Sequence, residues 1–234
     1  RYWRDWSSDV CSSDLVRIGI IPMGSGNGLA YALGIPYKVQ NALEIILDGK
    51  SAPIDAFRVN NHFACMLSGI GLDAIIAHRF AEQKRRGLLT YIRISALSFF
   101  TAGAYPVSVK TDNGNTIHTD IRFISIANSN QFGNHVTIAP GASLHDGLLD
   151  VVVVQKRNRL LTVLSVLIQI LFGKIKPASS EAKKKKPILY FQSKEISIEN
   201  PNMAPLHIDG EPVDTDKQIH IQITPSALLM IQPL

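Results

Sequence analysis

Apolar and polar residues follow one another along this chain with two different periods, and the change of period divides it. A short apolar run, Val16–Ile21, comes first and predicts a buried strand. Helical spacing follows at Asn27–Leu33, closed by Gly34 and Pro36, and again at Lys38–Leu47. Beyond that point the spacing is mostly that of strands.

The remainder of the chain is expected to be rich in strands, with a few helices among them. Its strands are expected at Ile54–Val59, Phe63–Ser68, Tyr105–Thr111, Thr116–Ala127, Leu148–Val154, Ile188–Ile198, Leu206–Ile208, Glu211–Val213, Gln218–Thr224 and Ala227–Ile231. Its helices are expected at Leu72–Lys84, Leu88–Thr101 and Leu160–Phe172. Turn signals typical of hairpins stand at Asn60-Asn61, Asp112-Asn113-Gly114 and Asp209-Gly210.

This order of elements predicts an α/β fragment at residues 16–50, followed by a β-rich domain at residues 51–234. Runs of strands with few helices favour an antiparallel sandwich over a parallel sheet. The C-terminal end of the second unit is expected to be free to pack back on the first.

Residues 1–15 do not fit this pattern, because serine and aspartate dominate them and apolar periodicity is absent. Reverse translation of Asp5–Leu15 matches a sequencing-library adapter in general use. We therefore expect residues 1–15 to be a non-native, adapter-derived segment, Cys11 included, and the native start to lie upstream of Val16.

Composition supports a globular chain with a real core, at 46% hydrophobic and 18% charged residues. With Cys11 set aside, Cys65 stands alone, so no disulfide forms within the chain and a cytoplasmic setting is the simplest. The net charge is +5, and Lys183–Lys186 is its densest run. That run favours a solvated loop over a contact with anionic lipid or nucleic acid.

The apolar segment Leu160–Phe172 is shorter than the ~18 residues that a membrane span needs. Basic residues flank it, among them Lys156, Arg157 and Lys174. Core packing is favoured for this segment, and peripheral docking on an anionic membrane is the alternative.

The glycine-rich stretch Gly24-Ser25-Gly26-Asn27-Gly28 lies between the first expected strand and the first expected helix. Glycines let the backbone approach a ligand, and N–H groups at a helix start suit an anion such as phosphate. The spacing matches neither a P-loop nor the dinucleotide fingerprint. On spacing alone, a tight turn without a ligand is an equal alternative.

The stretch Ile21–Pro36, IPMGSGNGLAYALGIP, resembles a segment of the diacylglycerol kinase catalytic-domain family, which includes bacterial lipid kinases and sphingosine kinases. Further elements resemble the family in the same order along the chain: Ile54-Asp55, Gly69-Ile70-Gly71-Leu72-Asp73-Ala74, Gly87–Tyr91, Ala127-Asn128 with Gly133, Ala139–Asp150 and His207-Ile208-Asp209-Gly210-Glu211. The resemblance extends from Val16 to Leu234.

This resemblance implies the two-domain architecture of NAD kinases and diacylglycerol kinases, with ATP between the domains and most of the first domain missing here. It implies nucleotide contacts at Gly24, Ser25, Gly26 and Asn27, and it makes Glu211 the general base. It also implies a structural Mg²⁺ site at Asp146, the Leu148 carbonyl and Ser143, although the family often has a carboxylate at the third position.

On spacing alone, a purely structural role in a turn remains an alternative for each of these carboxylates. Glu211 follows a turn, and spacing alone favours an exposed turn residue over a general base. Asp146 and Asp150 stand at the start of a strand, where an aspartate often caps a turn. His135 and His145 have no partner at metal-ligand spacing, so a zinc site is not expected.

The resemblance thus predicts an ATP-dependent lipid kinase that transfers the γ-phosphate to a diacylglycerol-like or sphingoid hydroxyl. The family's Gly-Gly-Asp-Gly-Thr loop does not occur here, so the chain is expected to be inactive alone. The alternatives are an NAD kinase-like enzyme and a non-catalytic lipid- or membrane-binding module. We expect a lipid substrate, a cytoplasmic location in contact with the inner membrane face, no nucleic-acid partner, and a homodimer as an open alternative to a monomer.

Overall fold

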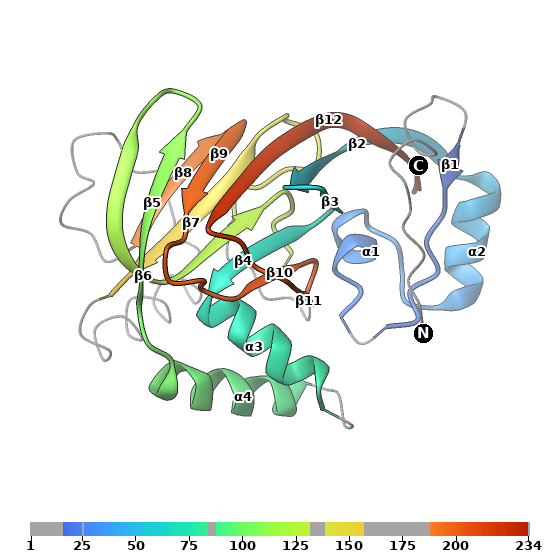
Figure 1. The fold of residues 1–234 in the computed structure, drawn as a ribbon. Helices are drawn as coiled ribbons and strands as arrows, with labels where there is room; N and C mark the ends of the chain where they lie inside the picture. Colours follow the sequence, from blue (N-terminus) through green and yellow to red (C-terminus); the bar gives the residue numbers. More distant parts are fainter. Residues whose placement is uncertain (1–15, 25, 84–87, 132–138, 157–187, 234) are drawn as a thin grey trace.

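A computed structural model describes residues 16–24, 26–83, 88–131, 139–156 and 188–233 of the chain. The predicted helix Leu160–Phe172 and the lysine run Lys183–Lys186 lie outside these residues. The first part forms a small lobe from β1 (Arg17–Ile18), α1 (Gly28–Ala32) and α2 (Val39–Asp48). Figure 1 shows this lobe at one end of the molecule, beside the C-terminal end of the last strand.

The first lobe departs from its sequence prediction at the opening strand. The apolar run Val16–Ile21 forms only the two-residue β1, and its residues are exposed or half-buried. This strand pairs in parallel with β12 (Gln218–Gln232), with Arg17 opposite Leu229. The prediction of a buried strand is therefore wrong, because β12 is its one partner among the described strands and the other edge of β1 is open.

The rest of the chain forms an antiparallel sheet that carries a helical hairpin. Its further strands are β2 (Lys50–Val59), β3 (His62–Ala64), β4 (Leu67–Gly71), β5 (Tyr105–Thr111), β6 (Thr116–Ala127), β7 (Leu149–Gln155), β8 (Ile188–Ser193), β9 (Glu195–Glu199), β10 (Leu206–Ile208) and β11 (Glu211–Val213). The described strands follow the order β11-β10-β4-β6-β5-β9-β12-β2-β3, with β7 and β8 branching from β6. The predicted β-rich antiparallel architecture is confirmed.

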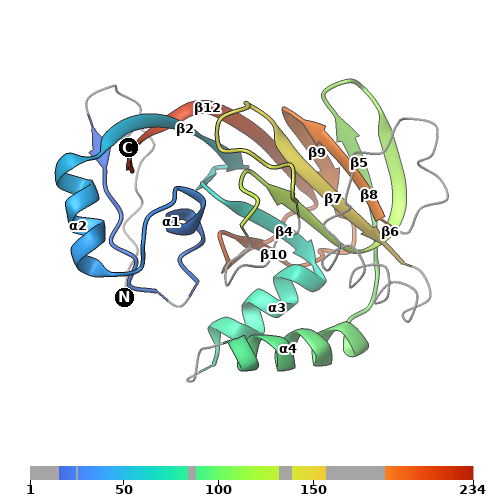
Figure 2. The same cartoon turned by 180° about the vertical axis from the view of Figure 1, so that it is seen from behind.

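The sheet folds over on itself because two of its strands change partners. The first half of β6 pairs with β5, and its second half pairs with β4 on one side and β7 on the other. Alternate residues of these strands point into one core, which includes Phe57, Ile124, Val151 and Ile198. Figures 1 and 2 show the curved sheet around this core from opposite sides.

The predicted strand Ile188–Ile198 is two strands, β8 and β9, divided at Lys194. β8 pairs with β7, whereas β9 pairs with β5 and β12. The apolar alternation shifts by one residue at the break, from Leu189 and Phe191 to Ile196 and Ile198, and both halves still face the same core. The prediction of one strand is wrong because the chain changes pairing partner there.

Two long strands join the lobe to the sheet. β2 pairs with β12 along nearly its whole length, and the register shifts between Thr224 and Leu228. The two C-terminal strands predicted separately are therefore one strand with a bulge. The buried Asp55 holds this bulge, because its Oδ1 accepts the Ser226 N–H at 2.8 Å.

The helices α3 (Leu72–Ala81) and α4 (Leu88–Thr101) form a hairpin below the sheet in Figure 1. α3 starts directly after β4 and contacts β10 and β11. An apolar cluster that includes Leu72, Ile76 and Ile94 joins the two helices. No described helix has the length and apolarity that crossing a bilayer demands.

We expect Asp112 to stabilise the corner at Lys194. Its carboxylate accepts the Lys194 N–H and the Ser193 hydroxyl, both at 2.9 Å. These contacts, the Lys194 N–H first, lower the pKa of Asp112. Asp112→Asn should therefore lower the free energy of unfolding by about 1 kcal/mol near neutral pH, as urea denaturation would measure.

The pH dependence of this effect has a definite sign. A folded pKa below the unfolded value of about 3.9 means that the ionised carboxylate stabilises the fold above that value. The stabilisation is lost as the pH falls through the folded pKa. The matched control is Asp120→Asn, because the one contact recorded for the Asp120 carboxylate among the described residues is a loose one with Lys156 Nζ at 3.9 Å. An equal effect of both substitutions would contradict the role of Asp112.

Candidate functional site

The glycine turn before α1 is closed by its own asparagine. The Gly24 N–H donates to Asn27 Oδ1 at 2.9 Å, and Asn27 Nδ2 donates to the Gly24 carbonyl at 2.7 Å. Asn27 adopts the left-handed backbone conformation, with φ of 44°. The side chain of Asn27 is thus engaged inside the turn, so it shapes the loop and leaves ligand contact to backbone groups. Ser25 lies outside the described residues.

The helix α1 forms the centre of an apolar cluster. Its residues Ala30 and Leu33 are buried with Leu144, and Cys65 packs against the same cluster. The helix ends as the sequence predicts, with the Ile35 N–H bonded to the Ala30 carbonyl at 2.8 Å. α1 therefore fixes the glycine turn relative to two distant loops, those around residues 65 and 144.

The β10–β11 hairpin presents Glu211. Ile208 pairs with Glu211 across a two-residue turn, in which Asp209 and Gly210 have φ of 49° and 86°. Positive φ at both central residues defines the tight hairpin turn that Asp-Gly predicts. Glu211 is exposed, and none of the hydrogen bonds or ion pairs recorded among the described residues involves its side chain. Its carboxylate is available to a substrate.

Asp209 anchors this hairpin to the loop between β3 and β4. Its Oδ2 accepts the Cys65 N–H at 2.8 Å, and its Oδ1 accepts the N–H groups of Met66 and Leu67 at 2.8 and 2.9 Å. Asp209 is exposed as a residue, but its carboxylate is occupied by these donors. Desolvation of the carboxylate raises the pKa of Asp209, while the three N–H donors oppose that rise.

These contacts connect the glycine turn to Glu211. Cys65 packs against the apolar cluster that includes Ala30 of α1, the Cys65 N–H donates to Asp209, and Asp209 lies two residues before Glu211. In Figure 1 the hairpin of β10 and β11 points toward α1. The structure therefore anchors the Glu211 hairpin and the described part of the glycine turn to the same small apolar cluster.

The loop with the predicted metal ligands reaches the same region through Leu144. The Leu144 carbonyl accepts the Asp55 N–H at 2.7 Å, and Asp55 Oδ2 accepts the Gly147 N–H at 2.7 Å. Asp146 is exposed, and its Oδ1 accepts the Leu148 N–H at 3.1 Å. The Ser143 hydroxyl accepts the His145 N–H at 3.2 Å.

These oxygens make a poor Mg²⁺ cage on their own. Asp146 contributes a single carboxylate, Ser143 and the Leu148 carbonyl are neutral, and the part of the chain that the structure describes has no cluster of three His, Cys, Asp or Glu. Asp150 does not add to them, because it is fully buried and accepts hydrogen bonds from Tyr190 and Gln192. Burial also raises the pKa of Asp150. The metal site stays a prediction.

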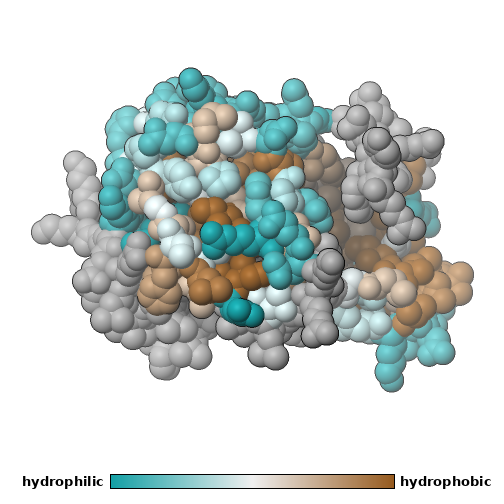
Figure 3. All heavy atoms as spheres, turned by 60° about the horizontal axis from the view of Figure 1, so that its bottom comes forward, coloured by the Kyte–Doolittle hydropathy of each residue, from teal (hydrophilic) through white to brown (hydrophobic). Residues whose placement is uncertain are grey.

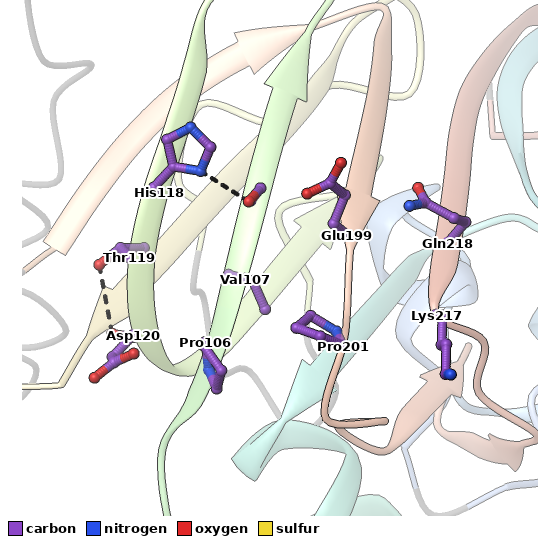
Figure 4. A pocket seen from close by; sticks show the side chains of 10 residues that line it. Pro106, Val107, His118, Thr119, Asp120, Glu199, Pro201, Lys217 and Gln218 are labelled. Carbon is purple, nitrogen blue, oxygen red and sulfur yellow. Dashed lines mark hydrogen bonds between the residues drawn. The ribbon is translucent and has the colours of Figure 1, made fainter.

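A separate groove of about 510 Å³ lies along β5, β6, the end of β9 and the start of β12. Figure 4 shows its lining residues, including His118, Asp120, Glu199 and Lys217. The His118 ring contacts the Ser108 hydroxyl at 2.8 Å. The groove shares no residue with the glycine turn, the Glu211 hairpin or the Asp146 loop, so we assign it no catalytic role.

The first lobe has an unusual share of exposed apolar side chains. Most of the large hydrophobic residues exposed in the described chain lie in it: Val16, Ile21, Met23, Tyr31, Tyr37, Val39, Leu43 and Leu47. Met23 and Leu47 are 78% and 81% exposed. Figure 3 shows apolar surface at the end of the molecule where this lobe lies. Surface of this kind usually contacts further protein.

The sequence predicts Glu211 and the glycine turn as site residues but not the residues that hold them in place. It marks Asp209 as part of a turn and of a family motif, and it gives no sign of the contacts made by Asp209, Asp55 and Asn128. Asn128 Nδ2 donates to the carbonyls of Asp55 and Cys65, both at 2.8 Å. Such contacts join positions tens of residues apart, so the local pattern around each residue carries no signal of them.

Comparison with known families supports the overall resemblance. Residues 67–232 match the YegS C-terminal NAD kinase beta sandwich-like domain, and residues 8–59 match the diacylglycerol kinase catalytic domain. The chain is 30% identical over 223 residues to the probable lipid kinase YegS-like of Shewanella frigidimarina, covering 93% of this chain and 68% of that protein. It is 26% identical over 220 residues to the protein of that name from Yersinia pestis, covering 90% and 68%.

Solved structures agree on the fold. A diacylglycerol kinase from Bacillus anthracis aligns with a TM-score of 0.66 at 19% identity, covering 92% of this chain and 66% of that one. A second Bacillus anthracis structure, provisionally assigned to the same kinase class, aligns with a TM-score of 0.74 at 20% identity, covering 96% and 72%. The predicted two-domain architecture of this class is confirmed.

We expect Asp209→Asn to loosen the Glu211 hairpin. An amide offers one acceptor oxygen to three N–H donors, so N–H groups of Cys65, Met66 or Leu67 lose their partner. The free energy of unfolding should fall by about 1–3 kcal/mol, with increased amide exchange at residues 65–67. Asp214→Asn is the control, because Asp214 is exposed on the same hairpin and has no recorded hydrogen bond among the described residues. Equal stability of both variants would refute the anchor.

Proposed function

The chain belongs to the YegS-like family of the diacylglycerol kinase class, and from that membership we propose that it acts as an ATP-dependent lipid kinase. The acceptor is the hydroxyl of a diacylglycerol-like or sphingoid lipid. One observation carries the proposal. The hairpin that presents the Glu211 carboxylate and the glycine turn that could bind phosphate are both attached to the same apolar cluster.

The reaction requires a proton acceptor near the lipid hydroxyl. The hydroxyl oxygen attacks the γ-phosphorus, its proton passes to Glu211, and the bond from that phosphorus to the β,γ-bridging oxygen breaks, which releases ADP. Phosphoryl transfer depends mainly on positioning and on neutralising phosphate charge. Glu211 suits the role of proton acceptor for two reasons. Asp209 anchors its hairpin, and no hydrogen bond of its carboxylate is recorded among the described residues.

The phosphates of ATP would lie against the glycine turn. Backbone N–H groups would come from Gly26 and Asn27, which are half-exposed, because the Gly24 N–H already donates to Asn27 Oδ1. A side chain at Gly26 would meet nothing within 4 Å, so the space beside it is open. Asn27 holds the turn in shape before ATP arrives, which lowers the entropy cost of binding.

Mg²⁺ supplies charge neutralisation in phosphoryl transfer. The oxygens of Asp146, Ser143 and Leu148 include one carboxylate, which is a weak donor set for a dedicated site. We therefore assign no step of the reaction to an ion held there. A fully hydrated ion beside Asp146 is the arrangement that these residues would support.

We propose that further α/β structure covers the first lobe. The exposed apolar residues of α2 suit such a cover, and so does the edge of β1 that no described strand pairs with. In our proposal that cover carries the Gly-Gly-Asp-Gly-Thr loop, and the present chain has no turnover without it. The part of the Shewanella relative that lies outside its match to this chain can be fused to the chain to supply it.

We expect the fused enzyme to phosphorylate a lipid hydroxyl and Glu211→Gln to abolish most of that activity. The substitution removes the proton acceptor but preserves shape, so kcat should fall by about 10²–10⁴-fold, with little change in lipid binding. Phosphate transfer from labelled ATP to diacylglycerol, a sphingoid base, phosphatidylglycerol and NAD would be measured side by side.

The control for this experiment is Glu199→Gln, because Glu199 is exposed on β9 and belongs to the separate groove. Phosphorylation of NAD in place of lipid would identify an NAD kinase. Lipid binding without any turnover, unchanged by Glu211→Gln, would identify a non-catalytic module. Turnover by the present chain at the rate of the fused enzyme would refute the need for the cover.

We expect Asn27→Ala to weaken ATP binding. The substitution removes both hydrogen bonds between Asn27 and Gly24, so the turn loses its preformed shape. The KM for ATP should rise about tenfold, as the loss of two hydrogen bonds of about 1 kcal/mol each permits. Asn113→Ala is matched to it, since Asn113 closes the β5–β6 turn in a similar way. If Asn27→Ala left the KM for ATP unchanged, the glycine turn would not be a binding site for the nucleotide.

A further inference from the structure

A buried acid and a buried histidine meet beside the Glu211 hairpin. Asp73 Oδ2 and His207 Nε2 are 3.2 Å apart, and their side chains are 8% and 2% exposed. No hydrogen bond is recorded for either atom among the described residues, so the two groups meet as an ion-pair contact without hydrogen-bond geometry. Burying polar groups costs free energy that such a contact offsets in part. Removal of either partner would leave the other without this neighbour.

The other nitrogen of His207 contacts the turn itself. The Gly210 N–H donates to His207 Nδ1 at 3.3 Å. A nitrogen that accepts a hydrogen bond carries no proton, so the ring proton of a neutral His207 is on Nε2. That nitrogen is the one that lies 3.2 Å from Asp73 Oδ2. The contacts therefore run in series from Asp73 through His207 to the residue before Glu211.

The backbone leaves space for this arrangement. A Cβ at Gly69 would lie 2.3 Å from Asp73 Oδ2 and 2.4 Å from His207 Nε2. Gly69 is opposite His207 in the pairing of β4 with β10. Any larger residue at position 69 would separate the two groups, so glycine there permits the contact.

The usual structural roles do not account for Asp73. It lies in the first turn of α3, where an acidic residue often caps the helix, but no side-chain capping bond is recorded there. The backbone of His207 is already held, because Ser68 Oγ donates to its carbonyl at 2.8 Å and β10 pairs with β4. The side-chain contacts add one thing, a link from α3 to the Gly210 amide.

We infer that His207, held by Asp73, is a positioning residue that sets the direction of Glu211. Asp209 anchors one end of the turn to the loop at residues 65–67, and His207 fixes the peptide on the other side of it. The two anchors together leave the turn little freedom to tilt. The effect on catalysis rests on the proposed role of Glu211, whereas the contacts themselves can be tested without it.

The first test uses the present chain and the ring nitrogens of His207. Nitrogen-15 NMR of labelled histidine should show His207 protonated on Nε2 and unprotonated on Nδ1 at neutral pH. His207→Gln identifies its signals. A proton on Nδ1, in the other neutral tautomer or in the charged ring, would overturn the inference, because Nδ1 could not then accept from Gly210.

The second test measures amide hydrogen exchange at Gly210 and Glu211 in variants of the same chain. His207→Gln keeps a hydrogen-bond donor near the position of Nε2 and removes the acceptor for the Gly210 N–H. His207→Asn keeps an acceptor near the position of Nδ1 and removes the contact with Asp73. Each, like Asp73→Asn, should raise exchange at Gly210 about fivefold, the change expected for one hydrogen bond. Asp73→Asn added to His207→Asn should cause no further rise.

His78→Gln is the matched control. His78 also packs from α3 onto β10, with its Nε2 3.0 Å from the Leu206 carbonyl, but it does not reach the turn. Its substitution should leave exchange at Gly210 unchanged. If His78→Gln and His207→Gln raised that exchange equally, the effect would be a general loosening and the inference would fail.

The third test uses the fused enzyme and separates positioning from stability. His207→Gln should lower kcat about tenfold or more while the KM for lipid stays the same, at a temperature where both enzymes are folded. A lower melting temperature with unchanged kcat would make the pair merely structural. If the fused wild type phosphorylated no lipid, the proposed function would fail, and the NMR and exchange results would still decide whether His207 holds the turn.

Discussion

Three backbone N–H groups in the loop between β3 and β4 point at one carboxylate, and the arrangement of the site depends on that contact. Asp209 accepts from Cys65, Met66 and Leu67, so the hairpin that carries Glu211 cannot move without losing these bonds. Met66 and Leu67 are buried, which leaves water little opportunity to replace the carboxylate. Cys65 also packs against the α1 cluster, so the same loop connects the hairpin to the glycine turn.

The helix α1 has a central place in this molecule despite its five residues. It brings the glycine turn, the Asp209 anchor and the Asp146 loop to one apolar cluster, through Cys65 and Leu144. Two carboxylates near it, Asp55 and Asp209, have their oxygens fully engaged with backbone N–H groups. Asp146 is exposed and accepts one N–H, from Leu148, and Glu211 is exposed with no recorded hydrogen bond of its side chain among the described residues. The carboxylates that hold the loops together and the one left for a substrate are therefore different residues.

Much of the fold followed from local pattern. β5 and β6 have their predicted bounds, and so do β10, β11 and α4, because alternation, helical spacing and turn residues act within a few positions. The failures share a cause. The strand at Val16–Ile21 is short because it has few neighbours, the strand at Ile188–Ile198 divides where it changes partner, and the C-terminal strands join across a bulge. Each depends on what lies beside the chain in space.

By itself, the sequence determined the class of fold and the positions of most strands and turns, and it predicted the two segments proposed as a phosphate site and a general base. These properties depend on residue type and short spacing, which a linear chain displays completely. Only the tertiary structure decided which carboxylates are engaged and which are exposed, that α1 joins three distant loops, and that Asp73 meets His207. Those facts arise from hydrogen bonds and packing between residues tens to more than a hundred positions apart, whose pairing no local pattern encodes.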